Sequence, residues 1–129
     1  MPPKTSRLPR IGLALLAAII LVFTLPAYAH PLSNPGLANL SGDPASLGSV
    51  AGAFLGRQLT LALIAVYGVV KGTREPMLIG AFAIAAFNLH DAVMIFGFGA
   101  GGAGAIAGLV IGAIGVAIMI SVMRSPRTA

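Results

Sequence analysis

Apolar residues occur in four long runs along this chain, and short segments rich in polar residues, Gly or Pro separate them. Each run is roughly 20 residues long, the length of α-helix that crosses the roughly 30 Å hydrocarbon core of a bilayer. The runs are too long for β-strands and do not alternate between polar and apolar positions. The pattern predicts an all-α fold, an integral membrane four-helix bundle that forms a single domain over residues 1–129. The helices are expected at about residues 8–29, 49–70, 77–98 and 103–123.

The first apolar run allows two interpretations. A basic head at residues 4–10 precedes it, and the sequence Ala-Tyr-Ala at residues 27–29 has the small-x-small layout of a signal-peptide cleavage site. The run is also long enough to span a membrane, with Pro26 marking the end of the helix. We expect a retained helix. Cleavage would leave a bundle of three helices, and the sequence leaves that alternative open.

The segments between the runs are predicted to be loops and turns. Residues 30–48 contain several Pro, Gly and Ser and a single charged residue, Asp43, which is typical of an irregular loop. A polar turn is expected at residues 71–76 and a Gly-rich link at residues 99–102.

Positive charges predict the orientation of the helices, because Lys and Arg in short loops favour the cytoplasmic side of a membrane. Outside the apolar runs they are Lys4, Arg7, Arg10, Lys71, Arg74, Arg124 and Arg127. These residues all fall on one side only if the chain crosses the membrane four times. We therefore expect a multi-pass protein with both termini cytoplasmic and residues 30–48 extracytoplasmic.

Composition agrees with burial in lipid. Hydrophobic residues make up 57% of the chain and charged residues 9%, too few polar residues to cover a soluble domain. The net charge of +5 does not indicate nucleic-acid binding, because the basic residues flank the apolar runs and form no compact patch. The chain has no Cys, which excludes disulfides, thiolate catalysis and Cys-ligated metals.

Five polar residues lie within the second and third runs, where a charged side chain costs about 2.5–3.5 kcal/mol and usually finds a partner inside the bundle. They are Arg57, Gln58, Asn88, His90 and Asp91. Arg57 and Asp91 are expected at similar depths, about 12 Å and about 10 Å from the helix ends at 1.5 Å per residue. We therefore predict a buried Arg57–Asp91 ion pair.

This intramembrane polar cluster has two interpretations. In one, Arg57, Asp91 and His90 line a small cavity that passes protons or anions or holds a polar head group. In the other, which we favour, the residues satisfy one another and fix which helices pack together. No third ligand accompanies His30 and His90, so no metal site and no cofactor is expected.

Glycines recur at four-residue spacing in two of the runs. They are Gly52 and Gly56 in the second run, and Gly104, Gly108 and Gly112 in the fourth. Small residues at this spacing allow helices to approach closely in lipid. We expect packing within the bundle, and a homodimer seam along the fourth helix is the alternative.

Two short motifs carry a family resemblance. Gly56-Arg57-Gln58 in the second run and Asn88-Leu89-His90-Asp91 in the third resemble small bacterial four-helix membrane proteins of unknown function, DoxX-like in layout. In those families a Gly-Arg element in the second helix is matched by an Asp late in the third. The resemblance covers most of the chain and implies a retained first helix and a bacterial inner (cytoplasmic) membrane. It implies no activity.

The expected function is that of a non-enzymatic accessory or assembly component, since the residues present supply neither a nucleophile with a base nor a pair of carboxylates. The alternative is a small oligomeric transporter or channel component that uses the same polar residues as its path. The expected partners are the lipid bilayer and either a second copy of the chain or another membrane protein, with no nucleic acid.

Overall fold

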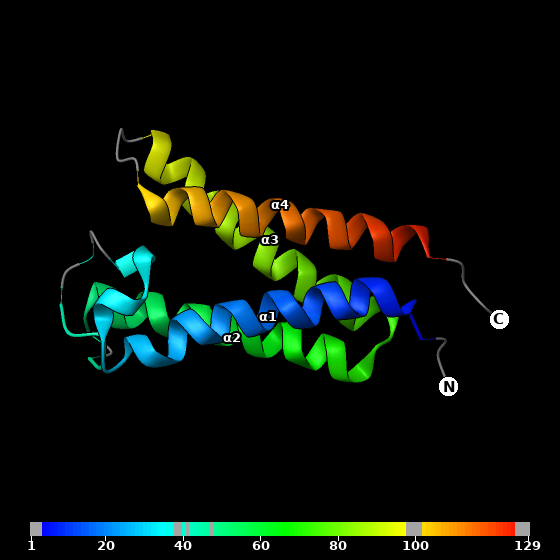
Figure 1. The fold of residues 1–129 in the computed structure, drawn as a ribbon, viewed down its shortest axis with the longest axis horizontal. Helices are drawn as coiled ribbons and strands as arrows, with labels where there is room; N and C mark the ends of the chain where they lie inside the picture. Colours follow the sequence, from blue (N-terminus) through cyan, green and yellow to red (C-terminus); the bar gives the residue numbers. More distant parts are fainter. Residues whose placement is uncertain (1–3, 38–39, 41, 47, 98–101, 126–129) are drawn as a thin grey trace.

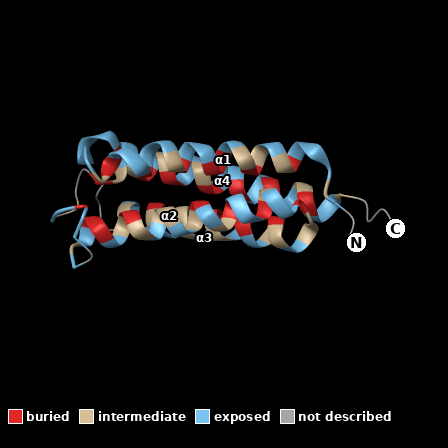
Figure 2. Ribbon diagram, turned by 90° about the horizontal axis from the view of Figure 1, so that it is seen from below, coloured by how far each residue is buried: buried red, intermediate tan, exposed pale blue. Residues whose placement is uncertain are grey.

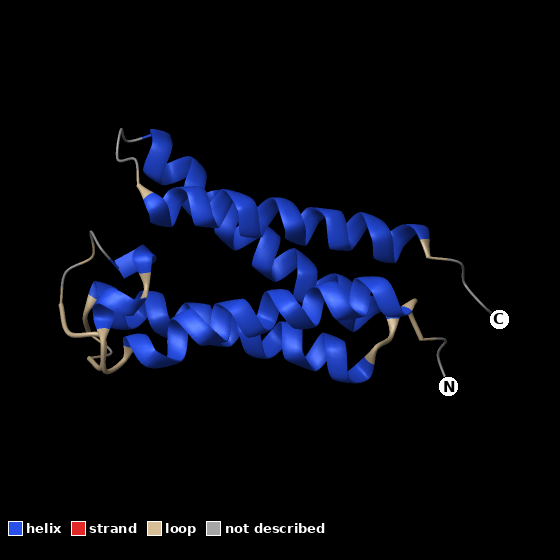
Figure 3. Cartoon of the chain, viewed as in Figure 1, coloured by secondary structure: helices blue, strands red, loops and turns tan. Residues whose placement is uncertain are grey.

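The computed structural model describes residues 4–37, 40, 42–46, 48–97 and 102–125, and over this part the chain is helical (Figure 3). The α-helices there are α1 (Arg7–Ala27), α2 (Val50–Lys71), α3 (Arg74–Gly97) and α4 (Ala103–Arg124). Two short 3₁₀ turns, η1 (Pro31–Ser33) and η2 (Pro35–Leu37), lie between α1 and α2. The predicted all-α, four-helix fold is confirmed.

All four helices are long and apolar enough to cross a membrane. They contain 21, 22, 24 and 22 residues, so each rises more than the roughly 30 Å of a hydrocarbon core at about 1.5 Å per residue. Their outward faces carry large exposed apolar side chains, among them Leu15, Val22, Leu63, Phe82 and Val110. Such a continuous apolar exterior is the surface that a bilayer covers.

The helices form a bundle in which α1 packs against α2 and α4, and α3 packs against the same two helices (Figure 1). Buried residues face inward and exposed residues face outward along every helix (Figure 2). The largest fully buried apolar side chains are Leu13, Leu16, Leu55, Met77, Ile84 and Val122. All of these except Leu55 belong to one cluster, the apolar core, to which all four helices contribute.

The start of α1, the end of α4 and the α2–α3 turn lie at the same end of the bundle, which we call the basic end (Figure 1). Thr5 donates from its backbone N–H and from Oγ1 to the carbonyl of Gly72, at 2.8 and 3.0 Å. Arg10 Nε donates to the carbonyl of Val69 at 2.7 Å. Arg74 Nη2 donates to the carbonyl of Met123 at 3.1 Å, which joins the start of α3 to the end of α4. The described basic groups that flank the apolar runs thus meet at one end, as four crossings require.

The α2–α3 turn is shorter than predicted. It consists of Gly72 and Thr73, whereas the sequence pattern placed a polar turn over residues 71–76. Gly72 ends α2 in the left-handed conformation at φ +65°, which glycine adopts without a steric penalty. Pro76 fits in the first turn of α3, because backbone N–H groups have no helical partner there.

The opposite end of the bundle, which we call the loop end, holds the segment between α1 and α2. Leu37 of η2 is buried in a small cluster with Ala27, Ala51 and Leu55. Ser49 caps α2, since its Oγ accepts a hydrogen bond from the backbone N–H of Gly52 at 2.9 Å. The predicted loop at residues 30–48 therefore contains two 3₁₀ turns that pack onto the bundle. The predicted Gly-rich link at residues 99–102 lies outside the described residues, except for Gly102.

The glycine face of α4 packs against α3, which confirms the expected internal packing. A Cβ atom on Gly112 would lie 2.6 Å from Leu89 Cγ, and one on Gly108 would lie 3.2 Å from the carbonyl oxygen of Asn88. Gly115 continues this face against Ala85. The absent side chains let the two backbones approach closely.

The other predicted packing glycines behave differently. A Cβ atom on Gly56 would meet nothing within 4 Å, so the expected helix contact at this residue is wrong. Gly52 adjoins the backbone of Ser46, and Gly104 adjoins Pro35 and Gly36, so the nearest neighbour of both is the loop segment. Close α2–α3 contacts are made instead by two glycines that were not among those predicted. Gly68 lies against the backbone of Pro76, and Gly80 lies against the backbone of Ala65.

Candidate functional site

The five predicted polar residues of α2 and α3 gather in the half of the bundle next to the loop end. Arg57 follows Val50, the first residue of α2, by seven positions, or about 10 Å at 1.5 Å per residue. Asp91 precedes Gly97, the last residue of α3, by six positions, or about 9 Å at the same rise. The two residues are therefore level in the antiparallel pair, and the structure brings them into contact.

Arg57, His90 and Asp91 form a charged patch on the surface of α2 and α3. Arg57 Nη2 lies 3.3 Å from Asp91 Oδ2, so the predicted ion pair is present. His90 Nδ1 lies 3.1 Å from Asp91 Oδ1. The side chains of Arg57 and His90 are 50% and 65% exposed, and that of Asp91 is 23% exposed. The expectation of a buried pair is therefore wrong, because these positions of α2 and α3 face outward and neither α1 nor α4 covers them.

Aromatic rings hold the Arg57 side chain at this surface. The guanidinium carbon lies 3.9 Å from the centre of the Phe87 ring and 5.8 Å from that of Phe54. A cation over a ring face is attracted by the ring quadrupole, and the attraction strengthens where water is excluded. The guanidinium is thus held over rings that belong to both α2 and α3.

Gln58, the neighbour of Arg57 in sequence, faces the interior and joins a separate inner network. Its Oε1 accepts a hydrogen bond from Asn34 Nδ2 at 2.9 Å and lies 3.1 Å from Thr24 Oγ1, whose single proton is shared with the carbonyl of Ile20 at 2.7 Å. Asn34 Oδ1 in turn accepts from the backbone N–H of Gly36 at 2.9 Å, which fixes the orientation of the Asn34 amide. Thr24 and Asn34 are 0% and 4% exposed. The inner network therefore ties α1, the loop segment and α2 together.

Sequence reasoning did not identify Thr24 and Asn34. Thr24 is a single hydroxyl in the most apolar stretch of the first run, and Asn34 lies in a segment predicted to be an irregular loop. The available signals were the position of Asn34 directly before Pro35, which favours a turn, and the cost of leaving Gln58 without partners in lipid.

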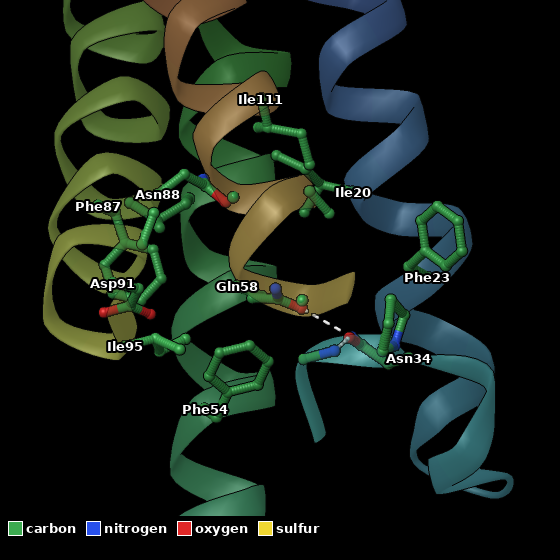
Figure 4. Close-up of a pocket in the computed structure, with 17 residues that line it drawn as sticks. Ile20, Phe23, Asn34, Phe54, Gln58, Phe87, Asn88, Asp91, Ile95 and Ile111 are labelled. Carbon is green, nitrogen blue, oxygen red and sulfur yellow. Dashed lines mark hydrogen bonds between the residues drawn. The ribbon is translucent and has the colours of Figure 1, made fainter. Parts of the chain in front are cut away.

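A cavity of about 120 Å³ lies between the charged patch and the inner network. Its polar lining consists of Asn34, Gln58, Asn88 and Asp91, and its walls include Phe23, Phe54 and Phe87. Figure 4 shows Gln58 and Asn88 reaching the same space from α2 and α3. Asp91 is part of the charged patch and also lines the cavity, so it is shared by the two.

Asn88 completes the predicted cluster. Its Nδ2 donates to the carbonyl of Ile84 on its own helix at 2.9 Å, so this amide nitrogen needs no partner on another helix. Its Oδ1 has no hydrogen-bond partner within the part of the chain that the structure describes, and neither does Nε2 of Gln58. The cavity lining thus offers one amide acceptor and one amide donor.

The five predicted polar residues therefore separate into an outward group and an inward group with a cavity between them. This arrangement can bind through charge on the outside and through hydrogen bonds on the inside. Comparison of the chain with protein-family models, with curated proteins and with solved structures gives no match.

Proposed function

We propose that this chain is a non-enzymatic accessory or assembly subunit of a bacterial inner membrane, which associates with another membrane-spanning protein through the charged patch. The observation that carries the proposal is the half-exposed side chain of Arg57, about 10 Å along α2 from the loop end. A helix of a partner that covers the patch would remove this charge from lipid.

The chemistry of Arg57 supports a partner that supplies hydrogen-bond acceptors. A guanidinium group has five N–H donors, and Asp91 accepts from one of its nitrogens in the described structure. In lipid the remaining donors lack water, and polar groups without partners there are costly. A carbonyl, hydroxyl or carboxylate on the facing helix would satisfy them.

The interior of the bundle fits a protein that binds a partner or ligand better than one that conducts ions or solutes. The cavity lies in the half of the bundle next to the loop end, where Asn88 and Asp91 line it. Toward the basic end the space between the helices is filled by the apolar core, in which Leu13, Met77 and Val122 are fully buried. A path for ions or polar solutes needs polar lining along its whole length. This bundle is therefore better suited to a binding role than to the transporter or channel alternative.

The position of the basic end supports the proposed topology. Arg10, Lys71, Arg74 and Arg124 gather there, and such groups favour the cytoplasmic side. We place both termini in the cytoplasm and the loop end on the opposite side. Membership of a DoxX-like group stays a prediction from the Gly-Arg and Asp motifs.

Site-specific photo-crosslinking in native membranes tests the partner proposal. A benzophenone side chain at Met94, an exposed residue one helical turn from His90, would report what lies against the patch. We expect a discrete adduct with a second, different membrane protein. The same probe at Val110, an exposed apolar position on α4, serves as the control and should give lipid adducts.

The substitution Arg57→Gln gives the second arm of this test. It removes the charge while leaving a side chain that can still hydrogen-bond, and it should abolish the Met94 adduct without changing membrane insertion. An adduct that persists in Arg57→Gln, or lipid adducts alone at Met94, would contradict the proposal. An adduct with a second copy of the chain would replace the accessory role by self-association.

A further inference from the structure

The cavity next to the inner network has a size that suits a single ring. Its volume is about 120 Å³, and a protein cavity of about 150 Å³ holds one benzene molecule. Phe23, Phe54 and Phe87 are among its walls, so much of its surface is aromatic. Aromatic side chains favour another ring in offset or edge-to-face contact.

The polar groups of the cavity indicate which substituent a bound ring would have. Oε1 of Gln58 is occupied by Asn34 and Thr24, which leaves its amide nitrogen as a donor toward the cavity. Asn88 bonds its own helix through its nitrogen, which leaves its oxygen as an acceptor. A hydroxyl group both donates and accepts one hydrogen bond, and it would satisfy these two amides together.

The charge balance of the cavity favours a neutral molecule. Asp91 is the charged residue of its lining, and Arg57 already pairs with that carboxylate. A cation would have to compete with Arg57 and His90 for Asp91, and an anion would be repelled by it. A neutral ligand meets neither obstacle.

We propose that this cavity binds a small neutral molecule built on one six-membered ring that carries a hydroxyl group, with the ring among the phenylalanines and the hydroxyl between Gln58 and Asn88. The site is independent of the proposed partner contact, since Arg57 does not line the cavity.

Fluorine NMR on the full chain in detergent micelles tests the proposal with 4-fluorophenol as the probe. We expect a saturable bound signal above the linear partitioning of the probe into micelles. 4-Fluorotoluene, which lacks the hydroxyl, should bind about 30-fold more weakly, the difference expected for two neutral hydrogen bonds of about 1 kcal/mol each. Binding that never saturates would overturn the proposal.

Two pairs of variants make the test specific. Ala107→Leu adds volume inside the cavity and should remove the saturable signal, whereas Ala113→Leu makes the same change at an exposed position of α4 and should retain it. Asn88→Leu should reduce the preference for 4-fluorophenol over 4-fluorotoluene to about fivefold, because it removes the acceptor and leaves the hydroxyl one hydrogen bond, from Gln58. Equal binding to the Ala107→Leu and Ala113→Leu variants, or an unchanged preference in Asn88→Leu, would show that the probe binds elsewhere.

The substitution Arg57→Gln separates this inference from the partner proposal. It should leave the affinity for 4-fluorophenol unchanged while abolishing the Met94 crosslink. A loss of probe binding in Arg57→Gln, with the bundle intact by circular dichroism and size-exclusion chromatography, would contradict the assignment of the site to the inner side of α2.

Discussion

Arg57 and Gln58 show how one position along a helix decides the role of a polar residue. Successive residues of an α-helix point about 100° apart. That rotation places Arg57 on the outside, against Phe87, and Gln58 on the inside, against Asn34. The outward residue is free to meet a partner, and the inward residue holds α1 and the loop segment in place.

The inner network makes Gln58 the most sensitive of the five polar positions. In Gln58→Leu the side chain keeps a similar volume, but the buried Asn34 amide loses the acceptor of its Nδ2, while Thr24 keeps the carbonyl of Ile20 as an acceptor at 2.7 Å. Leaving buried polar groups unsatisfied costs about 1–3 kcal/mol, so we expect the free energy of unfolding to fall by that amount. Unfolding in mixed micelles with increasing SDS measures it.

Thr60→Val is the matched control for this change. The hydroxyl of Thr60 is exposed and bonds the carbonyl of Gly56 within its own helix, so its removal should change stability by less than about 0.5 kcal/mol. If Gln58→Leu were as mild as Thr60→Val, the inner network would contribute nothing to the joining of α1 and α2.

The ion pair could be predicted from the sequence, but its exposure could not. The depths of Arg57 and Asp91 follow from the lengths of the apolar runs and the rise per residue. Exposure depends on which helices flank α2 and α3, and no local pattern reports that. The role of Asn34 was also missed because it depends on a neighbour in space. Its partner Gln58 lies on the next helix, and no pattern within residues 30–48 shows that contact.

At the scale of the elements, the α3–α4 contact depends on the glycine face of α4. A methyl group added at Gly112 would lie 2.6 Å from Leu89 Cγ, closer than packed atoms allow. At Gly56 the same methyl group would meet nothing within 4 Å. A change of Gly to Ala can therefore be compared at a packed position, Gly112, and at an open position, Gly56.

Gly112→Ala should lower the free energy of unfolding by about 1–3 kcal/mol, the range for overpacking of a well-packed interface. Gly56→Ala should raise it by up to about 1 kcal/mol, since Ala has the higher helix propensity. SDS titration of both variants measures the difference. Equal effects of the two substitutions would mean that α4 does not approach α3 through Gly112.

The glycine pattern predicted helix packing correctly at Gly108 and Gly112 of α4 and incorrectly at Gly104 and on α2, for a physical reason. On α4 the small residues continue through Gly115 and form a face long enough for a whole helix to pack against. On α2 the repeat stops after two residues, and Gly52 receives the loop segment while Gly56 stays open. A four-residue spacing shows that close approach is allowed, but it does not identify the neighbour.

At the scale of the whole molecule, the bundle has a basic end and a loop end, and cysteine labelling can assign them to the two sides of the membrane. The chain has no Cys, so single Cys residues can be introduced without a background. Ser6, Thr73 and Ser125 lie at the basic end, and Ser33 and Ser46 belong to the segment at the loop end. We expect a membrane-impermeant maleimide added to intact cells to label the last two positions alone.

Each pattern of labelling has a separate meaning. Labelling of all three basic-end positions, with none at the loop end, would reverse the orientation and keep the four crossings. A mixed result among Ser6, Thr73 and Ser125 would contradict the fold, because the structure places these residues together. Lysis of the cells before labelling should make all five positions reactive, which controls for burial.

The N-terminal contacts at the basic end have a consequence for the order of biosynthesis. Thr5 and Arg10 are made first, but their carbonyl partners on Gly72 and Val69 exist only after the second helix has been synthesised. The α2–α3 hairpin, whose contacts are close in sequence, can form as soon as both helices are inserted, and local contacts form fastest. The first helix to enter the membrane thus has no partner helix until α2 has been inserted, and over that interval its own backbone hydrogen bonds and its contacts with lipid stabilise it.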